Sequence, residues 1–113
     1  MDNKPNIKRA IPQRRYKFGE FGIVVLGDIE SDDIPNYRYI MAVVREGDPE
    51  PGIYLTSEAR RDGIFRVRLI MRDGEEVIAE DASYADVEIF SDAGIAILSQ
   101  ILNLADEEPY RLM

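Results

Sequence analysis

The sequence predicts an α+β fold, in which a mainly antiparallel sheet or partial barrel of about five to seven strands carries one C-terminal helix packed on a face. Two observations lead to this prediction. Short apolar runs rich in β-branched residues, separated by Gly, Pro and Asp, fill residues 14–81 and are typical of consecutive antiparallel strands. A single helical period of apolar residues follows near residues 91–105.

The length of the chain, 113 residues, is typical of one domain. Residues 1–13 contain Pro5 and Pro12 and show no apolar period. We therefore predict a basic flexible arm at residues 1–13 and a single α+β domain at residues 14–113.

The first strands are predicted from three apolar segments. Residues 14–18 alternate basic and aromatic side chains, which indicates a short half-buried strand. The run at residues 21–29 is apolar on both faces, so we expect it in the interior of the sheet. The run at residues 37–46 should form the next strand. Strict alternation would place four of its side chains on one face: Tyr37, Tyr39, Met41 and Val43.

A dense turn signal at residues 47–52 should join this strand to a short one at residues 53–56. Ser57 is then expected to cap one helical turn that Gly63 ends.

Residues 64–81 form the clearest hairpin in the sequence, with a turn at Arg72-Asp73-Gly74. A two-residue loop and a three-residue loop give registers that differ by one position. We favour the three-residue loop, because it keeps the apolar side chains of both strands on one face. Its cross-strand pairs are Leu69 with Val77, Val67 with Ala79, and Arg66 with Glu80.

The C-terminal helix is expected to follow a short strand at residues 86–90, with Ser91 as N-cap and an end near Ala105. Residues 107–113 read as a tail. The apolar residues of the helix cover about half its circumference, more than the roughly 100° needed to cover a sheet. They are Ile95, Ile97, Leu98, Ile101, Leu102, Leu104 and Ala105.

One margin of this wide helix face, formed by Ile97, Ile101 and Leu104, is our candidate interaction surface. The alternative is that the sheet curves around the helix and buries the whole face. The two interpretations differ in whether these three side chains contact a partner or the core.

The chain contains neither cysteine nor histidine. Their absence excludes disulfides, thiolate nucleophiles, zinc–thiolate sites and histidine-based acid–base catalysis. Any catalysis must rest on carboxylates, lysine, tyrosine, or a hard cation bound by oxygen. We therefore expect no cofactor, and a protein that is not an enzyme.

The densest acidic cluster follows the strand at residues 21–29 and comprises Asp28, Glu30, Asp32 and Asp33. Its spacing is similar to the start of a calcium loop, but Asp33 stands where glycine is needed and Tyr39 where a bidentate glutamate is needed. We expect a solvated turn. The alternative is a small-molecule or divalent-cation binding protein, or a carboxylate-based enzyme, that uses this acidic loop.

Charge is divided unevenly along the chain. Residues 1–19 carry six basic groups and one acid, a net charge of +5, whereas the remainder carries eight basic and 21 acidic groups, a net charge of −13. An acidic body repels nucleic acid and acidic membranes, so we predict neither as a partner. The alternative is that the acidic body mimics nucleic acid and binds a basic protein.

No apolar run is long enough to span a membrane, and the first residues form no apolar signal segment, so we expect a cytoplasmic protein. Together these features lead to the hypothesis of a small non-enzymatic interaction or regulatory protein. It would self-associate, for example as a homodimer, or bind a protein partner.

Overall fold

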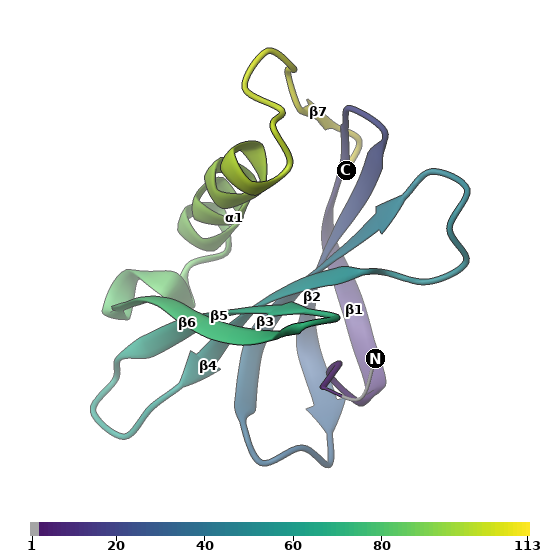
Figure 1. Cartoon of the computed structure of the whole chain (residues 1–113). Helices are drawn as coiled ribbons and strands as arrows, with labels where there is room; N and C mark the ends of the chain where they lie inside the picture. The colour runs from purple at the N-terminus through teal and green to yellow at the C-terminus, as the bar shows by residue number, and fades with distance from the viewer. Residues whose placement is uncertain (1–2) are drawn as a thin grey trace.

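The structure, a computed structural model, describes residues 3–113 and consists of one antiparallel sheet and one α-helix (Figure 1). The strands lie in the order β6-β5-β4-β3-β2-β1-β7, so the first six form a meander in chain order. A short 3-10 turn, η1 (Ala82–Ala85), leads into the helix α1 (Val87–Ile101). The predicted α+β class is confirmed. The strands are β1 (Ile7–Phe18), β2 (Phe21–Ser31), β3 (Asn36–Arg45), β4 (Ile53–Ala59), β5 (Phe65–Met71), β6 (Gly74–Asp81) and β7 (Tyr110–Arg111).

The helix α1 lies across one face of the sheet, and the main core fills the space between them. Phe90 and Leu98 of α1 are fully buried there, and the ring of Phe90 stacks on Tyr39 with centroids 5.7 Å apart. Gly94 permits the close approach, because an added Cβ would lie 2.5 Å from the Cε atom of Met41. A side chain at this point would have to displace the flexible end of the Met41 side chain.

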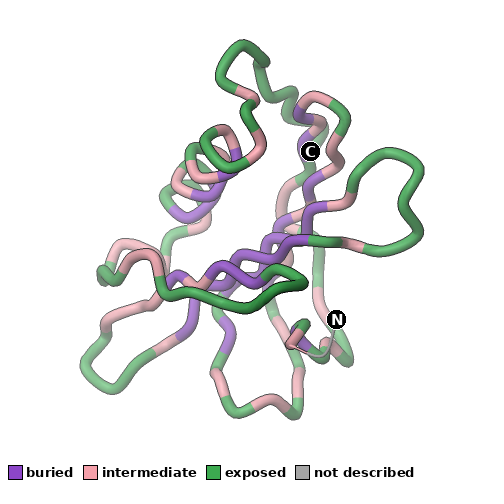
Figure 2. Tube along the Cα trace, viewed as in Figure 1, coloured by how far each residue is buried: buried purple, intermediate pink, exposed green. Residues whose placement is uncertain are grey.

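The central strands are also buried on the face that α1 does not cover. Their buried residues follow one another along the chain in Figure 2. Because the sheet is buried on both faces here, the sequences of its central strands are nearly continuous apolar runs. The second core is formed by Tyr37, Ile40, Ala42, Tyr54 and Ile70. The expectation that residues 21–29 form an interior strand is confirmed, since β2 lies between β1 and β3.

A β-bulge in β3 corrects the predicted alternation of its side chains. The pairing of β3 with β4 shifts register between Tyr37 and Tyr39. Tyr39, Met41 and Val43 share one face, as predicted, and this face is the one toward α1, but Tyr37 belongs to the second core on the other face. The extra residue of a bulge resets the two-residue period, and the amino-acid pattern alone carries no mark of it.

The first strand begins earlier than the sequence indicates. β1 starts at Ile7, so residues 7–13 of the expected arm lie in the sheet, whereas residues 1–2 lie outside the described part of the chain. Three register shifts against β2 occur before Arg14. They interrupt the alternating pattern there, which is why a regular period is visible only from that residue onward.

The end of the chain returns to the sheet. Within the expected tail at residues 107–113, Tyr110 and Arg111 form β7 and pair with β1. The Leu112 N–H then donates a hydrogen bond of 2.7 Å to the Arg15 carbonyl oxygen. A pairing between the two ends of the chain has no local signal in the sequence.

The helical turn predicted after residue 56 is wrong, because β4 continues to Ala59. Ser57 is fully buried, and its hydroxyl donates a hydrogen bond of 2.8 Å to the Tyr84 carbonyl oxygen in η1. Its hydroxyl thus joins the sheet to η1, where it satisfies a carbonyl that precedes the helix.

The β5–β6 hairpin follows the favoured register only in the half farther from its turn. Leu69 pairs with Glu76, and not with Val77 as predicted. A bulge separates this half from the other and shifts the register by one residue. The two predicted pairs that are confirmed are Val67–Ala79 and Arg66–Glu80.

The helix begins before the predicted position. Asp86 is the N-cap, and its carboxylate accepts hydrogen bonds of 2.8 and 3.0 Å from the next turn. Ser91, the predicted cap, lies buried inside α1, where its hydroxyl donates to the Val87 carbonyl oxygen at 2.6 Å. The strand predicted at residues 86–90 is therefore wrong, and α1 also ends early, at Ile101.

Candidate functional site

One flank of α1 carries a row of apolar residues spaced four apart: Ile89, Ala93, Ile97 and Ile101. Residues four apart lie on one side of a helix, and such rows form the ridges by which helices pack. Ile89 is 45% exposed and Ile101 is 40% exposed, while the two residues between them are half-buried. We call this row the outer ridge.

The three predicted interaction residues all lie at the C-terminal end of α1 or just beyond it. Ile101 is exposed, whereas Ile97 and Leu104 are half-buried and pack partly against the main core. Leu104 covers the β1–β2 turn, where an added Cβ on Gly19 would lie 2.9 Å from its Cδ2 atom. Their contact with a partner stays a prediction.

One ridge residue, Ile89, was missed by the sequence analysis. It falls in the segment that was expected to be a strand, because Ser91 was taken as the cap. The spacing of four between Ile89, Ala93, Ile97 and Ile101 is visible in the sequence once Asp86 is recognised as the start of the helix.

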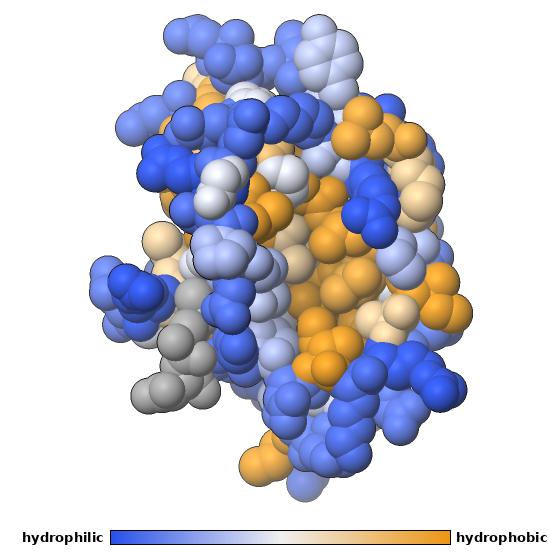
Figure 3. Space-filling model, turned by 90° about the vertical axis from the view of Figure 1, so that its right-hand side faces the viewer, coloured by the Kyte–Doolittle hydropathy of each residue, from blue (hydrophilic) through white to orange (hydrophobic). Residues whose placement is uncertain are grey.

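A second apolar surface lies on the opposite side of the sheet. Figure 3 shows a strip of hydrophobic residues between hydrophilic margins on the side of the molecule away from α1. A hollow of about 200 Å³ opens here. Its floor comes from β2 and β3 and its rims from β1, the β3–β4 loop and the C-terminal tail. We call it the sheet groove; it includes Arg15, Val24, Ala42, Val44, Pro51 and Leu112.

The rim of the sheet groove contains exposed groups. Leu112 is 68% exposed, and its backbone is held by the hydrogen bond to Arg15. The side chain of Arg15 is exposed and forms no ion pair with any residue between 3 and 113. No sequence signal marked this groove, because Leu112 reaches it only through the pairing of β7 with β1.

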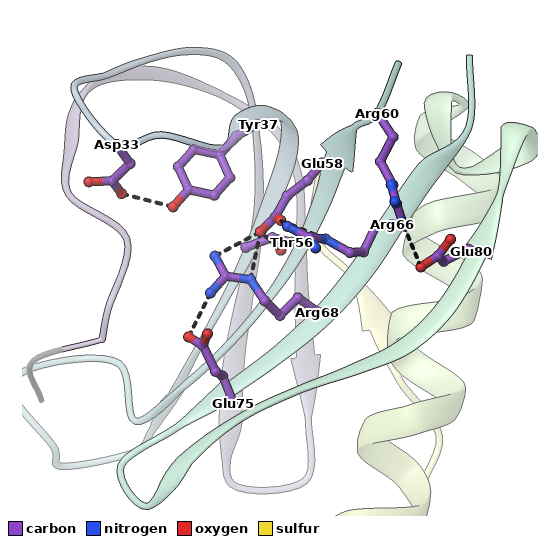
Figure 4. A network of polar contacts seen from close by, with 9 residues as sticks. All are labelled: Asp33, Tyr37, Thr56, Glu58, Arg60, Arg66, Arg68, Glu75 and Glu80. Carbon is purple, nitrogen blue, oxygen red and sulfur yellow. Dashed lines mark hydrogen bonds and ion pairs between the residues drawn. The ribbon is translucent and has the colours of Figure 1, made fainter. Parts of the chain in front are cut away.

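The most enclosed polar cluster centres on Glu58 of β4, whose side chain is 1% exposed (Figure 4). One carboxylate oxygen accepts hydrogen bonds from Arg66 Nε and Nη2 at 3.1 and 2.8 Å. The other accepts from Arg68 Nε at 2.8 Å and from the Thr56 hydroxyl at 2.7 Å. Arg68 also donates to Glu75 at 2.6 Å.

Pairing of β4 with β5 explains this cluster. Glu58 lies directly opposite Arg66, and Arg68 lies diagonally across, opposite Thr56. Within residues 3–113, every buried side-chain nitrogen and oxygen has a hydrogen-bond partner. All the strong donors and acceptors around Glu58 are therefore engaged with one another, which is the arrangement of a structural ion network.

The predicted acidic loop is tied to the start of β1. Asp33 accepts hydrogen bonds of 2.9 Å from the Asn6 N–H and 2.8 Å from the Tyr37 hydroxyl. These two donors hold the pKa of Asp33 below its usual value. Burial and the bond to Asp33 raise the pKa of Tyr37, so its hydroxyl stays protonated and acts as a donor.

The other three acids of this loop point to no shared centre. Asp32 forms an exposed ion pair of 2.7 Å with Lys8, and Asp28 and Glu30 are exposed on β2. Across residues 3–113, no group of three or more acids is arranged to hold a metal ion. In the same span, no helix is long and apolar enough to cross a membrane.

Comparisons of the chain with protein-family models, with curated proteins and with solved structures found no match. Two surfaces of the molecule itself, the outer ridge and the sheet groove, present exposed apolar residues in an ordered arrangement.

Proposed function

We propose that this chain is a non-enzymatic interaction protein that self-associates through the outer ridge of α1. The observation that carries the proposal is the row Ile89, Ala93, Ile97 and Ile101, which leaves Ile89 and Ile101 exposed along one flank of the helix at the spacing of a packing ridge. A single exposed apolar residue needs no explanation, but an aligned row along one helix face is typical of an interface.

The energy available from the ridge is modest and suits reversible association. Complete burial of an isoleucine side chain stabilises by about 1.5–3 kcal/mol. Ile89 and Ile101 are already more than half-buried, so each adds roughly 1 kcal/mol in each copy. Association must also overcome lost translational and rotational freedom, so further contacts have to accompany the ridge.

Two polar centres, the network around Glu58 and the hydroxyl of Tyr37, support the non-enzymatic part of the proposal. The enclosed network around Glu58 is saturated by hydrogen bonds, and Tyr37 holds its proton. General acid–base catalysis needs a group that can exchange a proton near neutral pH, and Tyr37, whose pKa is raised, does not offer one.

The test compares two isoleucine-to-aspartate variants by sedimentation velocity over a range of concentrations. Ile101→Asp should shift the protein toward the monomer, because a charge would be desolvated in the interface. Ile34→Asp is the matched control, since Ile34 is fully exposed in the β2–β3 loop and away from α1. If Ile101→Asp associates as strongly as the control, the helix face is not the interface and the proposal fails.

A further inference from the structure

We propose that the outer ridge of one copy docks into the sheet groove of a second copy, so that association is head-to-tail. This inference rests on the proposed self-association. The two surfaces lie on opposite sides of the same sheet, so one copy presents both a ridge and a groove (Figures 1 and 3). Docking would give the sheet a helix on each face, which is a stable way to cover an apolar sheet.

Charge complementarity identifies the partner as a second copy. Residues 73–110, which include β6 and α1, contain eleven acids and no basic residue. Residues 3–19, which include β1, contain six basic residues and no acid. The ridge thus belongs to a segment whose charged residues are all acidic, and β1 places the basic side chain of Arg15 on the rim of the groove. Opposite charges on the two surfaces favour their encounter.

The same charges fix the orientation of the docked helix. Glu88 and Asp92 are exposed on the first turns of α1 beside Ile89, where they also attract Arg14 of their own chain, and Arg15 is the exposed basic group that lines the groove. The acidic margin of the helix should therefore lie along β1, with an isoleucine of the ridge in the hollow beside Leu112. The opposite rim is the β3–β4 loop, which contains Glu46, Asp48 and Glu50 and repels the acidic margin.

Pairing of ridge with ridge is the main competitor, and the charges disfavour it. A two-fold contact between two α1 helices would bring two copies of the acidic segment together. Like charges across an interface destabilise it, and neither helix carries a basic residue of its own. In the head-to-tail contact, each acidic helix meets the basic strand of its neighbour.

Head-to-tail contact has a consequence for assembly size. Each copy in a pair keeps one free ridge or one free groove, so the assembly grows into a ring or an open chain and does not stop at two. The parent protein should show a series of masses that extends with concentration, and high salt should shorten the series.

The decisive experiment mixes two variants, each defective in one surface. Ile101→Asp damages the ridge and leaves the groove, whereas Val44→Asp damages the groove and leaves the ridge. Each alone should bind itself at least about tenfold more weakly than the parent. An equimolar mixture, with one variant isotopically labelled, should give a heterodimer by native mass spectrometry. It should stop at two copies, because only the damaged surfaces remain free.

Leu112→Asp provides a second groove variant, because Val44 is half-buried and its substitution can unfold the sheet. Circular dichroism confirms that each variant is folded, and Ile34→Asp serves as the control that should assemble like the parent. If Leu112→Asp and a folded Val44→Asp both assemble like the parent while Ile101→Asp does not, the groove is not the dock. The head-to-tail inference then fails and the ridge remains.

Two other outcomes also separate the proposals. If both variants are monomeric and their mixture stays monomeric, the two surfaces do not meet each other and the head-to-tail inference fails. If Ile101→Asp itself assembles like the control, the ridge is not used at all and the proposed function falls with the inference.

Discussion

Removal of the Glu58 charge is the sharpest test of what stabilises the face of the sheet that α1 does not cover. Glu58→Gln keeps the shape of the side chain but leaves Arg68, whose side chain is only 12% exposed, without its buried counter-ion. Loss of one partner of a buried ion pair typically costs about 3–5 kcal/mol. We expect the lower end, about 3 kcal/mol, because Arg66 is 33% exposed and can turn toward water.

The matched control changes the other carboxylate that binds the same arginine. Glu75 is 47% exposed, so Glu75→Gln should cost less than about 1 kcal/mol. Urea unfolding followed by circular dichroism measures both. A loss of about 3 kcal/mol lowers the midpoint by roughly 1–3 M for a domain of this size. Equal decreases in the free energy of unfolding for the two variants would refute the reasoning. They would mean that burial of Glu58 does not strengthen the contribution of its ion pairs to stability.

Two further predictions concern the helix cap and the acidic loop. Asp86→Ala removes the acceptor of two N–H groups and should destabilise the protein by about 1 kcal/mol in the same urea assay. Ser91→Ala removes no N-cap and should not show the destabilisation that follows from the loss of one. Asp33 has a pKa in the folded protein below its usual 3.8, so its carboxylate contributes stability above that pH and loses this contribution as the pH falls through the folded value. The stability difference between the parent and Asp33→Asn should therefore shrink below about pH 4 in acid-dependent urea titrations, and a constant difference would contradict this.

The order of the elements follows from local sequence signals. Turn residues separate the β-branched runs, and neighbouring runs pair as an antiparallel meander, which is the most common outcome for short connections. The class and the C-terminal helix were predictable for this reason. The registers were only partly predictable, because the bulges beside Tyr37 and near Val67 are set by packing on both faces of the sheet.

The error at the start of α1 shows how burial decides between two local signals. Asp86 and Ser91 are both good N-caps, and the sequence favours neither outright. A start at Asp86 adds a turn that places Phe90 against Tyr39 in the main core, and the burial of that ring decides between them. The candidate ridge was predictable only in its second half for the same reason, since Ile89 lies in the added turn.

The two edges of the sheet argue that association uses its faces. An open edge strand is a template for pairing with another chain, and proteins block such edges with charges, prolines and bulges. β6 at one edge carries Glu75, Glu76, Glu80 and Asp81.

At the other edge, β1 carries Pro12 and three register shifts, and β7 covers part of it. Both edges are therefore poor templates, and β6 in particular repels a second β6. This favours the outer ridge and the sheet groove as the surfaces of the proposed self-association. In the proposed assembly, their opposite charges favour contact between ridge and groove over contact between like surfaces, and this preference follows from the segregation of charge along the chain.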